Sequence, residues 1–217
     1  MNADQILEAI TIWALPVIFA ITLHEAAHGW VASKLGDPTA KSLGRITANP
    51  LKHIDLMGTV VVPLILVILG GFVFGWAKPV PVDARNFKKP LQHMALVAIA
   101  GPASNLIMAC FWALIMAFAI NWLEPDQWLK RPLAMMAQAG VLINLVLMTL
   151  NLLPLLPLDG GRVVTGFLSP RAAMIFMKIE PYGLIILLLL LFSGILGKIL
   201  GPVVGQLQTI LYTVIGL

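Results

Sequence analysis

Two histidines and a glutamate lie in the middle of a stretch that otherwise suits a membrane helix. The stretch runs from Ile10 to Val31, and a helix needs about 20 apolar residues to cross the core of a bilayer. It contains His24, Glu25 and His28. Ionisable side chains are costly to hold in hydrocarbon, so a helix that carries three of them is expected to use them. The placement therefore predicts a functional site on a membrane helix.

The composition supports a membrane location. Hydrophobic residues make up 59% of the 217 residues, charged residues make up 11%, and the mean hydropathy is +0.94. These values exclude an ordinary soluble domain and a disordered chain, and they predict a multi-pass protein of the lipid bilayer. Cys110 is the only cysteine, which rules out an internal disulfide. The net charge of +4 comes without a basic and aromatic patch, so no nucleic-acid partner is expected.

Long apolar runs organise the chain into one membrane domain. We predict an all-α polytopic fold, a bundle of four to six transmembrane helices, over residues 1–217. Its core spans about residues 6–165, and C-terminal membrane helices follow at about 181–217. The runs lie at about residues 6–33, 56–74, 93–122, 133–157 and 182–217.

Two connectors between the apolar runs are mainly basic. Residues 34–55 hold four Lys or Arg against two Asp, and residues 78–89 hold four against one. Lysine and arginine accumulate in cytoplasmic loops of membrane proteins, so both connectors are predicted to be cytoplasmic. The apolar run between them then cannot be a simple crossing.

We expect residues 56–90 to form a re-entrant element. A half-helix would enter the membrane and an extended, β-like segment would return, because Pro79 and Pro81 forbid a regular helix over residues 75–82. Such a backbone is tolerated at membrane depth only where protein or a wet cavity surrounds it. The alternative is a true span followed by a basic loop outside.

The spacing of His24, Glu25 and His28 suits a hydrolytic metal site. Residues four apart share one helix face, with Cβ atoms about 6 Å apart, so both imidazoles can reach one metal ion. Glu25 lies roughly 100° from His24 and roughly 60° from His28 around the helix, where a general base could reach metal-bound water. Zinc lowers the pKa of such water to about 7. The alternative is that these side chains only join helices through hydrogen bonds.

A catalytic zinc ion needs a third protein ligand, and Asp159 is the strongest candidate. It is the only acidic residue between Asp126 and Glu180, and it ends an apolar run immediately before two glycines. Pro154 and Pro157 break the helix before it. Other candidates lie near basic connectors, where interfacial or helix-capping roles are expected. They are His53, Asp55, which suits an N-cap, Asp83 and His93.

With these motifs the sequence resembles the site-2 protease family of intramembrane zinc metalloproteases. The resemblance covers roughly residues 20–165. It rests, in this order, on His24-Glu25-Ala26-Ala27-His28, on the distal element with Asn151, Pro154 and Asp159-Gly160, and on Gly101-Pro102-Ala103-Ser104-Asn105, which opens a middle membrane helix. The first motif also occurs in soluble metalloproteases, whereas the combination is highly specific.

The resemblance implies roles for particular residues. It implies that His24, His28 and Asp159 bind one Zn²⁺ per chain, with Glu25 as the catalytic base. It also implies an active site that opens toward the cytoplasm, in a multi-pass protein of the cell membrane. Gly75 to Val82 would correspond to the family's re-entrant β segment.

The expected substrate is a transmembrane segment of another membrane protein. Such a helix must unwind before its peptide bonds can be cut, and an exposed edge strand could pair with the freed backbone. Asn105 and Asn151 could also bind substrate backbone, although hydrogen bonds between helices explain these amides equally well. The residues predicted for strand pairing are Gly75, Trp76, Ala77, Lys78, Pro79 and Val80.

The predicted function is regulated hydrolysis of peptide bonds in or near transmembrane segments. The alternative is a membrane-embedded metal transporter that uses the same ligands. Transport would require further ligands strung through the thickness of the membrane, and the sequence has no second cluster of that kind.

Overall fold

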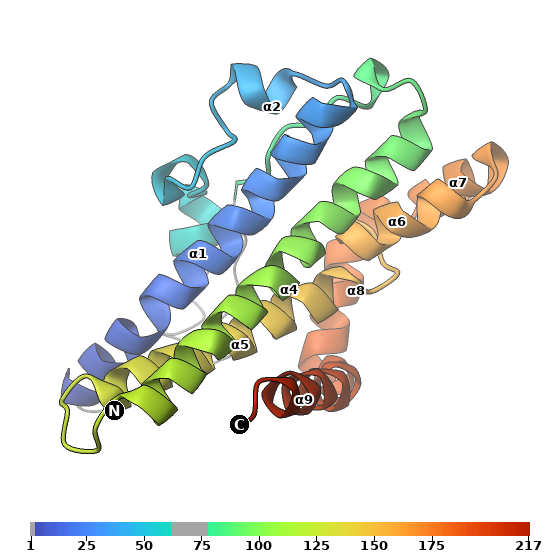
Figure 1. Ribbon diagram of the computed structural model, residues 1–217. Helices are drawn as coiled ribbons and strands as arrows, with labels where there is room; N and C mark the ends of the chain where they lie inside the picture. The colour runs from blue at the N-terminus through green and yellow to red at the C-terminus, as the bar shows by residue number, and fades with distance from the viewer. Residues whose placement is uncertain (1–2, 62–77) are drawn as a thin grey trace.

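Three long helices form the centre of the molecule (Figure 1). The computed structural model describes residues 3–61 and 78–217, and within these ranges it contains helices and no strand. The long helices are α1 (Ala3–Leu35), α4 (Pro90–Trp122) and α5 (Lys130–Asn151). Each runs antiparallel to the one before it, and α4 packs against both of the others. The predicted all-α class is confirmed for the described residues.

Shorter elements connect these helices and form the C-terminal region. α1 ends where Gly36 takes a φ of 111°, a left-handed conformation that glycine adopts without strain. α4 begins at a proline, whose missing N–H would have no partner in the first turn. The remaining elements are α2 (Thr39–Ser42), the 3-10 helix η1 (Pro50–Lys52), the π-helix η2 (Leu56–Val61), the 3-10 helix η3 (Ala84–Asn86), α6 (Asp159–Phe167), α7 (Pro170–Met177), α8 (Glu180–Phe192) and α9 (Ile195–Val214).

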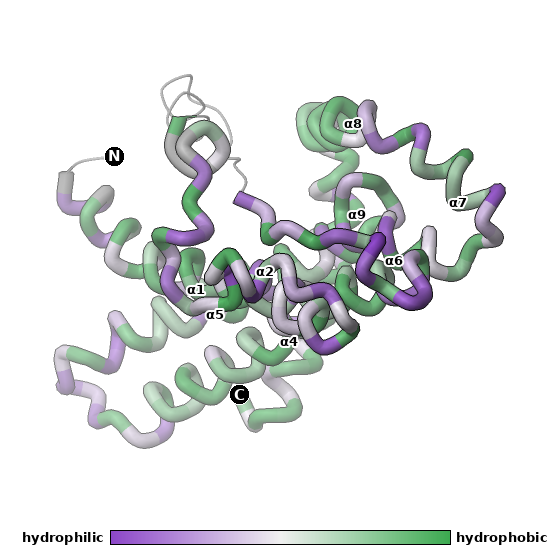
Figure 2. The backbone as a smooth tube through the Cα atoms, turned by 90° about the horizontal axis from the view of Figure 1, so that it is seen from above, coloured by the Kyte–Doolittle hydropathy of each residue, from purple (hydrophilic) through white to green (hydrophobic). Residues whose placement is uncertain are grey.

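Three described helices are long and apolar enough to cross a membrane. They are Leu7–Leu35, Pro90–Trp122 and Lys130–Asn151, and the pair α7 and α8, bent by 57°, would make a fourth. Hydrophilic residues gather in the connectors, while the helices are mainly hydrophobic (Figure 2). The multi-pass prediction is therefore supported. The predicted count of four to six spans is not confirmed, because the described residues give three such helices, or four if the bent pair is one span.

The predicted re-entrant element is described only at its two ends. Asp55 Oδ1 accepts a hydrogen bond from the Gly58 N–H at 2.7 Å, so Asp55 caps η2 as predicted. Residues 62–77 lie outside the described part of the chain, and they include Gly75, Trp76 and Ala77. Residues 78–83 are neither helix nor strand. A re-entrant β segment is thus not confirmed.

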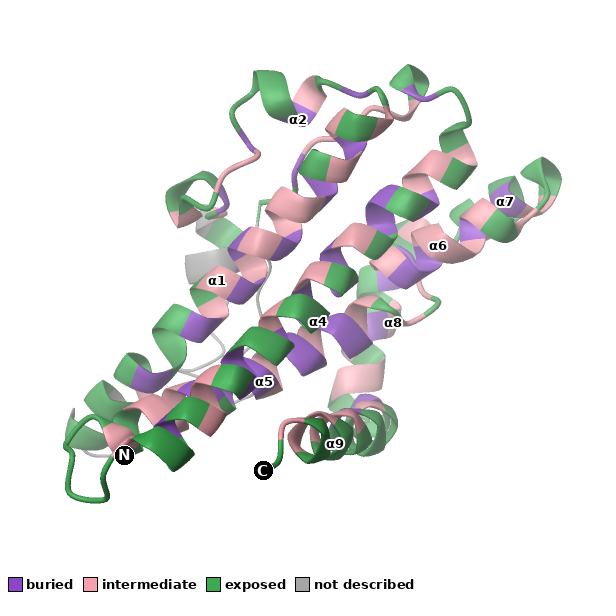
Figure 3. Ribbon diagram, viewed as in Figure 1, coloured by how far each residue is buried: buried purple, intermediate pink, exposed green. Residues whose placement is uncertain are grey.

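The interior of the bundle is built on small residues and one large aromatic side chain. Trp112 of α4 is 4% exposed and packs directly over Gly140 of α5, where a Cβ atom would overlap the indole. Buried residues run along the facing sides of the three long helices, and their outer sides are exposed (Figure 3). Among these exposed residues are Ile107 (69%) and Leu114 (60%). Apolar outward surfaces of this kind suit contact with lipid.

A buried carboxylate ties two connectors together beyond the end of α1. Asp37 is 0% exposed. Its oxygens accept hydrogen bonds from the backbone N–H of Asp83 and the amide of Asn86, both at 2.7 Å, and from Thr39. Burial raises the pKa of Asp37, but the hydrogen bonds from Thr39, Asp83 and Asn86 together hold that pKa below its ordinary value. Asp37 therefore anchors one end of the segment 78–83.

Arg45 anchors the other end of this segment. Its side chain is buried, and Nη2 donates hydrogen bonds to the carbonyl oxygens of Lys78 at 2.9 Å and Pro79 at 3.3 Å. The Lys78 N–H in turn donates to the His53 carbonyl at 2.9 Å. The segment that passes α1 is thus held at both ends by the connector between α1 and η2.

Asp37→Asn is expected to destabilise the protein. The substitution replaces one carboxylate oxygen by an NH₂ group, which cannot accept the hydrogen bonds that this oxygen now receives. Each hydrogen bond to a charged group that is lost costs about 1.5 to 3 kcal/mol. Since the pKa of Asp37 is lowered by folding, its stabilisation is complete above about pH 4 and is lost as the pH falls through the folded-state pKa. Thermal unfolding in detergent should therefore show a gap between wild type and variant that is wide at pH 7 and narrows toward pH 3.

The matched control is Asp126→Asn, because Asp126 is exposed in the loop between α4 and α5. An unchanged unfolding temperature for Asp37→Asn at pH 7 would contradict the anchoring role.

Candidate metal centre

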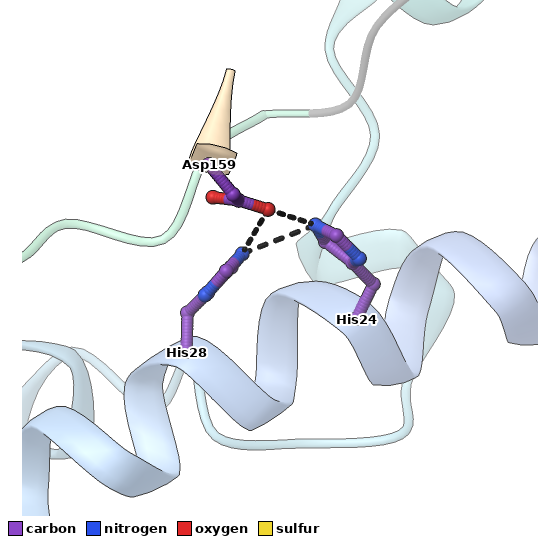
Figure 4. A group of neighbouring side chains, drawn as sticks. All are labelled: His24, His28 and Asp159. Carbon is purple, nitrogen blue, oxygen red and sulfur yellow. Dashed lines mark hydrogen bonds and ion pairs between the residues drawn. The ribbon is translucent and has the colours of Figure 1, made fainter. Parts of the chain in front are cut away.

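Three side chains from two distant parts of the chain converge inside the bundle (Figure 4). His24 Nε2 and His28 Nε2 lie 3.1 Å apart on α1. Oδ2 of Asp159, the first residue of α6, lies 3.2 Å from the first nitrogen and 3.4 Å from the second. The three side chains are 10%, 11% and 13% exposed. Among the described residues, this is the one group of His, Cys, Asp and Glu side chains close enough to share a metal ion.

The hydrogen bonds on the far sides of the imidazoles set their protonation. His28 Nδ1 lies 2.7 Å from the carbonyl oxygen of Val97, which can only accept, so Nδ1 carries the proton. His24 Nδ1 lies 2.6 Å from Asn105 Oδ1. The Asn105 amide is oriented by its own Nδ2, which donates to the carbonyl of Ala20 at 3.2 Å and to Asn144 Oδ1 at 2.9 Å. When either ring is neutral, its Nε2 therefore presents a lone pair to the centre.

The converging atoms fit a bound cation. With both rings neutral, two imidazole lone pairs and a carboxylate oxygen repel one another at 3.1 to 3.4 Å unless a proton or a metal ion lies between them. Asp159 Oδ2 is also buried without a hydrogen-bond partner among the described residues. Ligand atoms about 2.0 to 2.1 Å from zinc at tetrahedral angles lie about 3.3 to 3.4 Å from one another, close to the spacing seen here.

Gly101 lets α4 approach the two histidines. A Cβ atom at this position would lie 2.5 Å from His24 Cε1 and 2.5 Å from both Cε1 and Nε2 of His28. Real carbon atoms do not approach so closely, so any larger residue would push both rings away. One turn later on the same helix, Asn105 holds His24. α4 thus supplies the space and the hydrogen bond that orient the two rings.

A tight loop brings Asp159 to the centre. The chain leaves α5 at Asn151 and enters α6 at Asp159. Gly160 packs against the carbonyl oxygens of Leu152 and Leu153, where a Cβ atom would overlap them. The loop therefore folds back over the start of α6 and leaves Asp159 facing α1.

Glu25 lies beside the centre and does not belong to the group of three. Its Oε2 accepts a hydrogen bond from the Val80 N–H at 2.8 Å, which joins α1 to the segment 78–83. Within the described part of the chain, no hydrogen bond engages Oε1. One oxygen of Glu25 is thus held by Val80, and the other has no such contact in these residues.

The structure brings together some of the residues singled out in the sequence and separates others. His24, His28 and Asp159 meet, and the four rival candidates do not join them. Asn105 is 0% exposed and binds His24 and neighbouring helices, which supports the interhelical alternative over substrate binding. Asn151 donates to the carbonyl of Leu147 at 3.0 Å, and its substrate role stays a prediction.

Several supporting residues were missed in the sequence. Asp37 and Arg45 looked like ordinary connector charges, and Val97 contributes only a backbone carbonyl. The sequence held one signal for Asp37, because it follows a helix-ending glycine and precedes a proline, where a capping carboxylate is common. Nothing in the sequence indicates which helix a buried carbonyl will face.

Comparisons with known proteins agree on one family. Residues 12–130 match Peptidase family M50. The chain is 41% identical over 193 residues to YwhC of Bacillus subtilis (strain 168), whose name gives it as a zinc metalloprotease. The aligned region covers 88% of this chain and 84% of YwhC.

Two mycobacterial proteins called Rip2, also named as zinc metalloproteases, are more distant. The protein from Mycolicibacterium smegmatis is 27% identical over 189 residues, covering 83% of this chain and 66% of its own length. The protein from Mycobacterium tuberculosis (strain H37Rv) is 26% identical over 180 residues, covering 81% of this chain and 64% of its own length. The chain thus spans just under two thirds of these two relatives. No solved structure matches it significantly.

Asn105→Leu is expected to weaken metal binding. It removes the acceptor that holds the His24 Nδ1 proton, so the ring can rotate or take the other tautomer. Loss of such a partner typically lowers metal affinity about 10- to 100-fold. Competition with a chromogenic chelator on the purified full chain would measure the change. Asn121→Leu is the control, since Asn121 is exposed near the end of the same helix; equal losses in both variants would contradict the role given to Asn105.

Proposed function

This chain belongs to peptidase family M50, and from that premise we propose that it cuts peptide bonds in or beside transmembrane segments of other membrane proteins. We propose His24, His28 and Asp159 as the ligands of one zinc ion and Glu25 as the catalytic base. The observation that carries the proposal is the meeting of His24 and His28, on a helix apolar enough to cross a membrane, with the buried carboxylate of Asp159 from α6.

The location of the centre supports a substrate within the membrane. His24 and His28 belong to the apolar stretch Leu7–Leu35, and the side chains around them are supplied by two further apolar helices. A soluble peptide would have to leave water to reach such a site, whereas a transmembrane segment can reach it by moving within the plane of the bilayer. The substrate must be partly unwound on arrival, because a helix engages its own peptide groups in hydrogen bonds.

The chain's own residues then orient the reactants. Bound zinc supplies a Lewis acid that acidifies water and polarises a carbonyl group. Glu25 Oε1 accepts a proton from the attacking water, whose oxygen forms a bond to the scissile carbonyl carbon. As the C–N bond breaks, the same oxygen delivers that proton to the leaving nitrogen. The Val80 N–H keeps the carboxylate of Glu25 in place through Oε2.

We propose that substrate pairs with the segment Gly75, Trp76, Ala77, Lys78, Pro79 and Val80, and that Asn151 contributes a side-chain contact. The described hydrogen bonds limit where pairing can occur. The Lys78 N–H already donates a hydrogen bond to the His53 carbonyl, and the Val80 N–H donates one to Glu25. Pro79 has no N–H. The carbonyl oxygens of Lys78 and Pro79 already accept hydrogen bonds from Arg45. Strand addition on the described part must therefore share these oxygens, use the Val80 carbonyl, or displace Glu25 from Val80.

Metal transport is less well supported. A permeation path would need further ligand groups along the membrane thickness. Within residues 3–61 and 78–217 only the single group of three is found. The two histidines are also locked by Asn105 and Val97, which suits a resident ion better than a transient one.

We further propose that the centre opens toward the cytoplasm, in the cell membrane. The basic connectors that follow α1 and precede α4 meet at one end of the bundle, where Asp37 and Arg45 join them. An excess of lysine and arginine marks cytoplasmic loops. Release of a membrane-tethered factor into the cytoplasm is the biological outcome that this orientation favours.

Glu25→Gln and Asp159→Ala should separate catalysis from metal binding. Glu25→Gln keeps all three ligands, so zinc content should stay near one ion per chain while cleavage of a reporter transmembrane peptide falls at least about 100-fold. Asp159→Ala removes a ligand, so zinc affinity and cleavage should fall together. Zinc is measured by atomic absorption and cleavage in detergent micelles. Full cleavage by Glu25→Gln would exclude the mechanism.

Cysteine labelling should establish the orientation. In a Cys110→Ala background, Lys88→Cys and Asp126→Cys place single thiols at exposed positions just before and just after α4. A membrane-impermeant maleimide should modify the thiol at 126 in intact cells and the thiol at 88 only after permeabilisation. The reverse pattern would place the centre on the outer side.

A further inference from the structure

α8 contacts the loop before Asp159 at a point where only glycine fits. Gly183 of α8 is buried, and a Cβ atom there would overlap the carbonyl oxygen of Leu156 and lie 2.7 Å from Cδ of Pro157. The overlapping oxygen is backbone, so no side-chain rotation can relieve the overlap. The backbone of α8 therefore rests directly on the backbone of the loop.

The same loop residue is held from the opposite side by α6. Leu156 is 2% exposed. A Cβ atom at Gly161 would lie 2.6 Å from the Leu156 nitrogen. Leu156 thus lies between Gly161 of α6 and Gly183 of α8, and Asp159 follows three residues later. Because Leu156 already touches both Gly161 and Gly183, it has no room to move toward either helix. A shift of the loop at Leu156 is therefore transmitted along the chain to Asp159.

An ion pair joins α6 and α8 next to this contact. Arg162 Nη2 donates to Glu180 Oε1 at 3.3 Å. Arg162 lies three residues after Asp159 and Glu180 three residues before Gly183, so each pair shares a helix face. The two side chains are 39% and 40% exposed, and such a pair contributes little stability by itself. The pair does show that α8 makes contacts around Asp159 at two successive turns, with α6 through Glu180 and with the loop through Gly183.

We propose that Gly183 is a positioning residue for the metal centre, through which α8 holds Asp159 at ligand distance from His24 and His28. The inference rests on the proposed role of Asp159 as a ligand. Metal–ligand distances tolerate only about 0.2 Å, while a methyl group at Gly183 forces a larger shift in the loop. A C-terminal helix outside the part of the chain that carries the motifs therefore helps to determine zinc affinity.

Gly183→Ala tests this proposal against a matched glycine. Gly205→Ala is the control, because no atom of residues 3–61 or 78–217 beyond the neighbouring backbone of α9 itself lies within 4 Å of a Cβ atom at Gly205. Zinc affinity of the purified full chain is measured by chelator competition, with circular dichroism and gel filtration as checks of folding. Gly183→Ala should lower the affinity about 10- to 100-fold, Gly205→Ala should leave it unchanged, and Asp159→Ala should lower it further.

A second variant covers the case in which Gly183→Ala does not fold. Leu187 is 5% exposed and lies one turn later on the same face of α8. Leu187→Ala loosens this face without a steric overlap and should reduce zinc affinity by a smaller factor. If Gly183→Ala folds and binds zinc with wild-type affinity, the proposal is overturned. If Gly183→Ala does not fold, wild-type zinc affinity in Leu187→Ala overturns the proposal instead. Wild-type affinity in Asp159→Ala would instead overturn the ligand assignment itself.

Discussion

The convergence of three lone pairs at one buried point is the constraint on which the rest of the structure depends. His24 Nε2, His28 Nε2 and Asp159 Oδ2 lie 3.1 to 3.4 Å apart, an arrangement that is repulsive unless a proton or a metal ion lies between these atoms. Contacts with the surrounding helices must therefore keep each of these three side chains in place. These contacts are hydrogen bonds on the far side of each ring and close backbone approaches at glycines.

This requirement explains why neighbouring elements pack as they do. α4 contributes Gly101 above the rings and Asn105 beside His24, and α5 contributes Asn144, which orients Asn105. The segment 78–83 holds Glu25 and is itself held by Asp37 and Arg45. The polar network is satisfied almost throughout, as a low-dielectric interior requires. Within the described part of the chain, the exceptions among the buried side chains include Asp159 Oδ2, the atom that faces the two histidine nitrogens.

Much of the site and part of the fold could be predicted from residue order. Helical periodicity placed His24 and His28 on one face, and the cost of an acidic group in an apolar run singled out Asp159. The amide of Asn105 could not be assigned, because binding substrate and joining helices need the same side chain. Its burial and its bond to His24 became visible only once α1, α4 and α5 were packed together.

Local sequence alone determined the apolar helices and the placement of His24, Glu25 and His28 next to one another on one of them, because these depend on composition and on the 3.6-residue period of one helix. Tertiary structure decided which carbonyl faces His28, which connector charges hold the segment beside Glu25, and which C-terminal helix supports Asp159. The contact between Asp37 and Asp83 joins residues 46 positions apart, and the contact between His28 and Val97 joins residues 69 positions apart. No local preference encodes them, since they follow from how the helices pack.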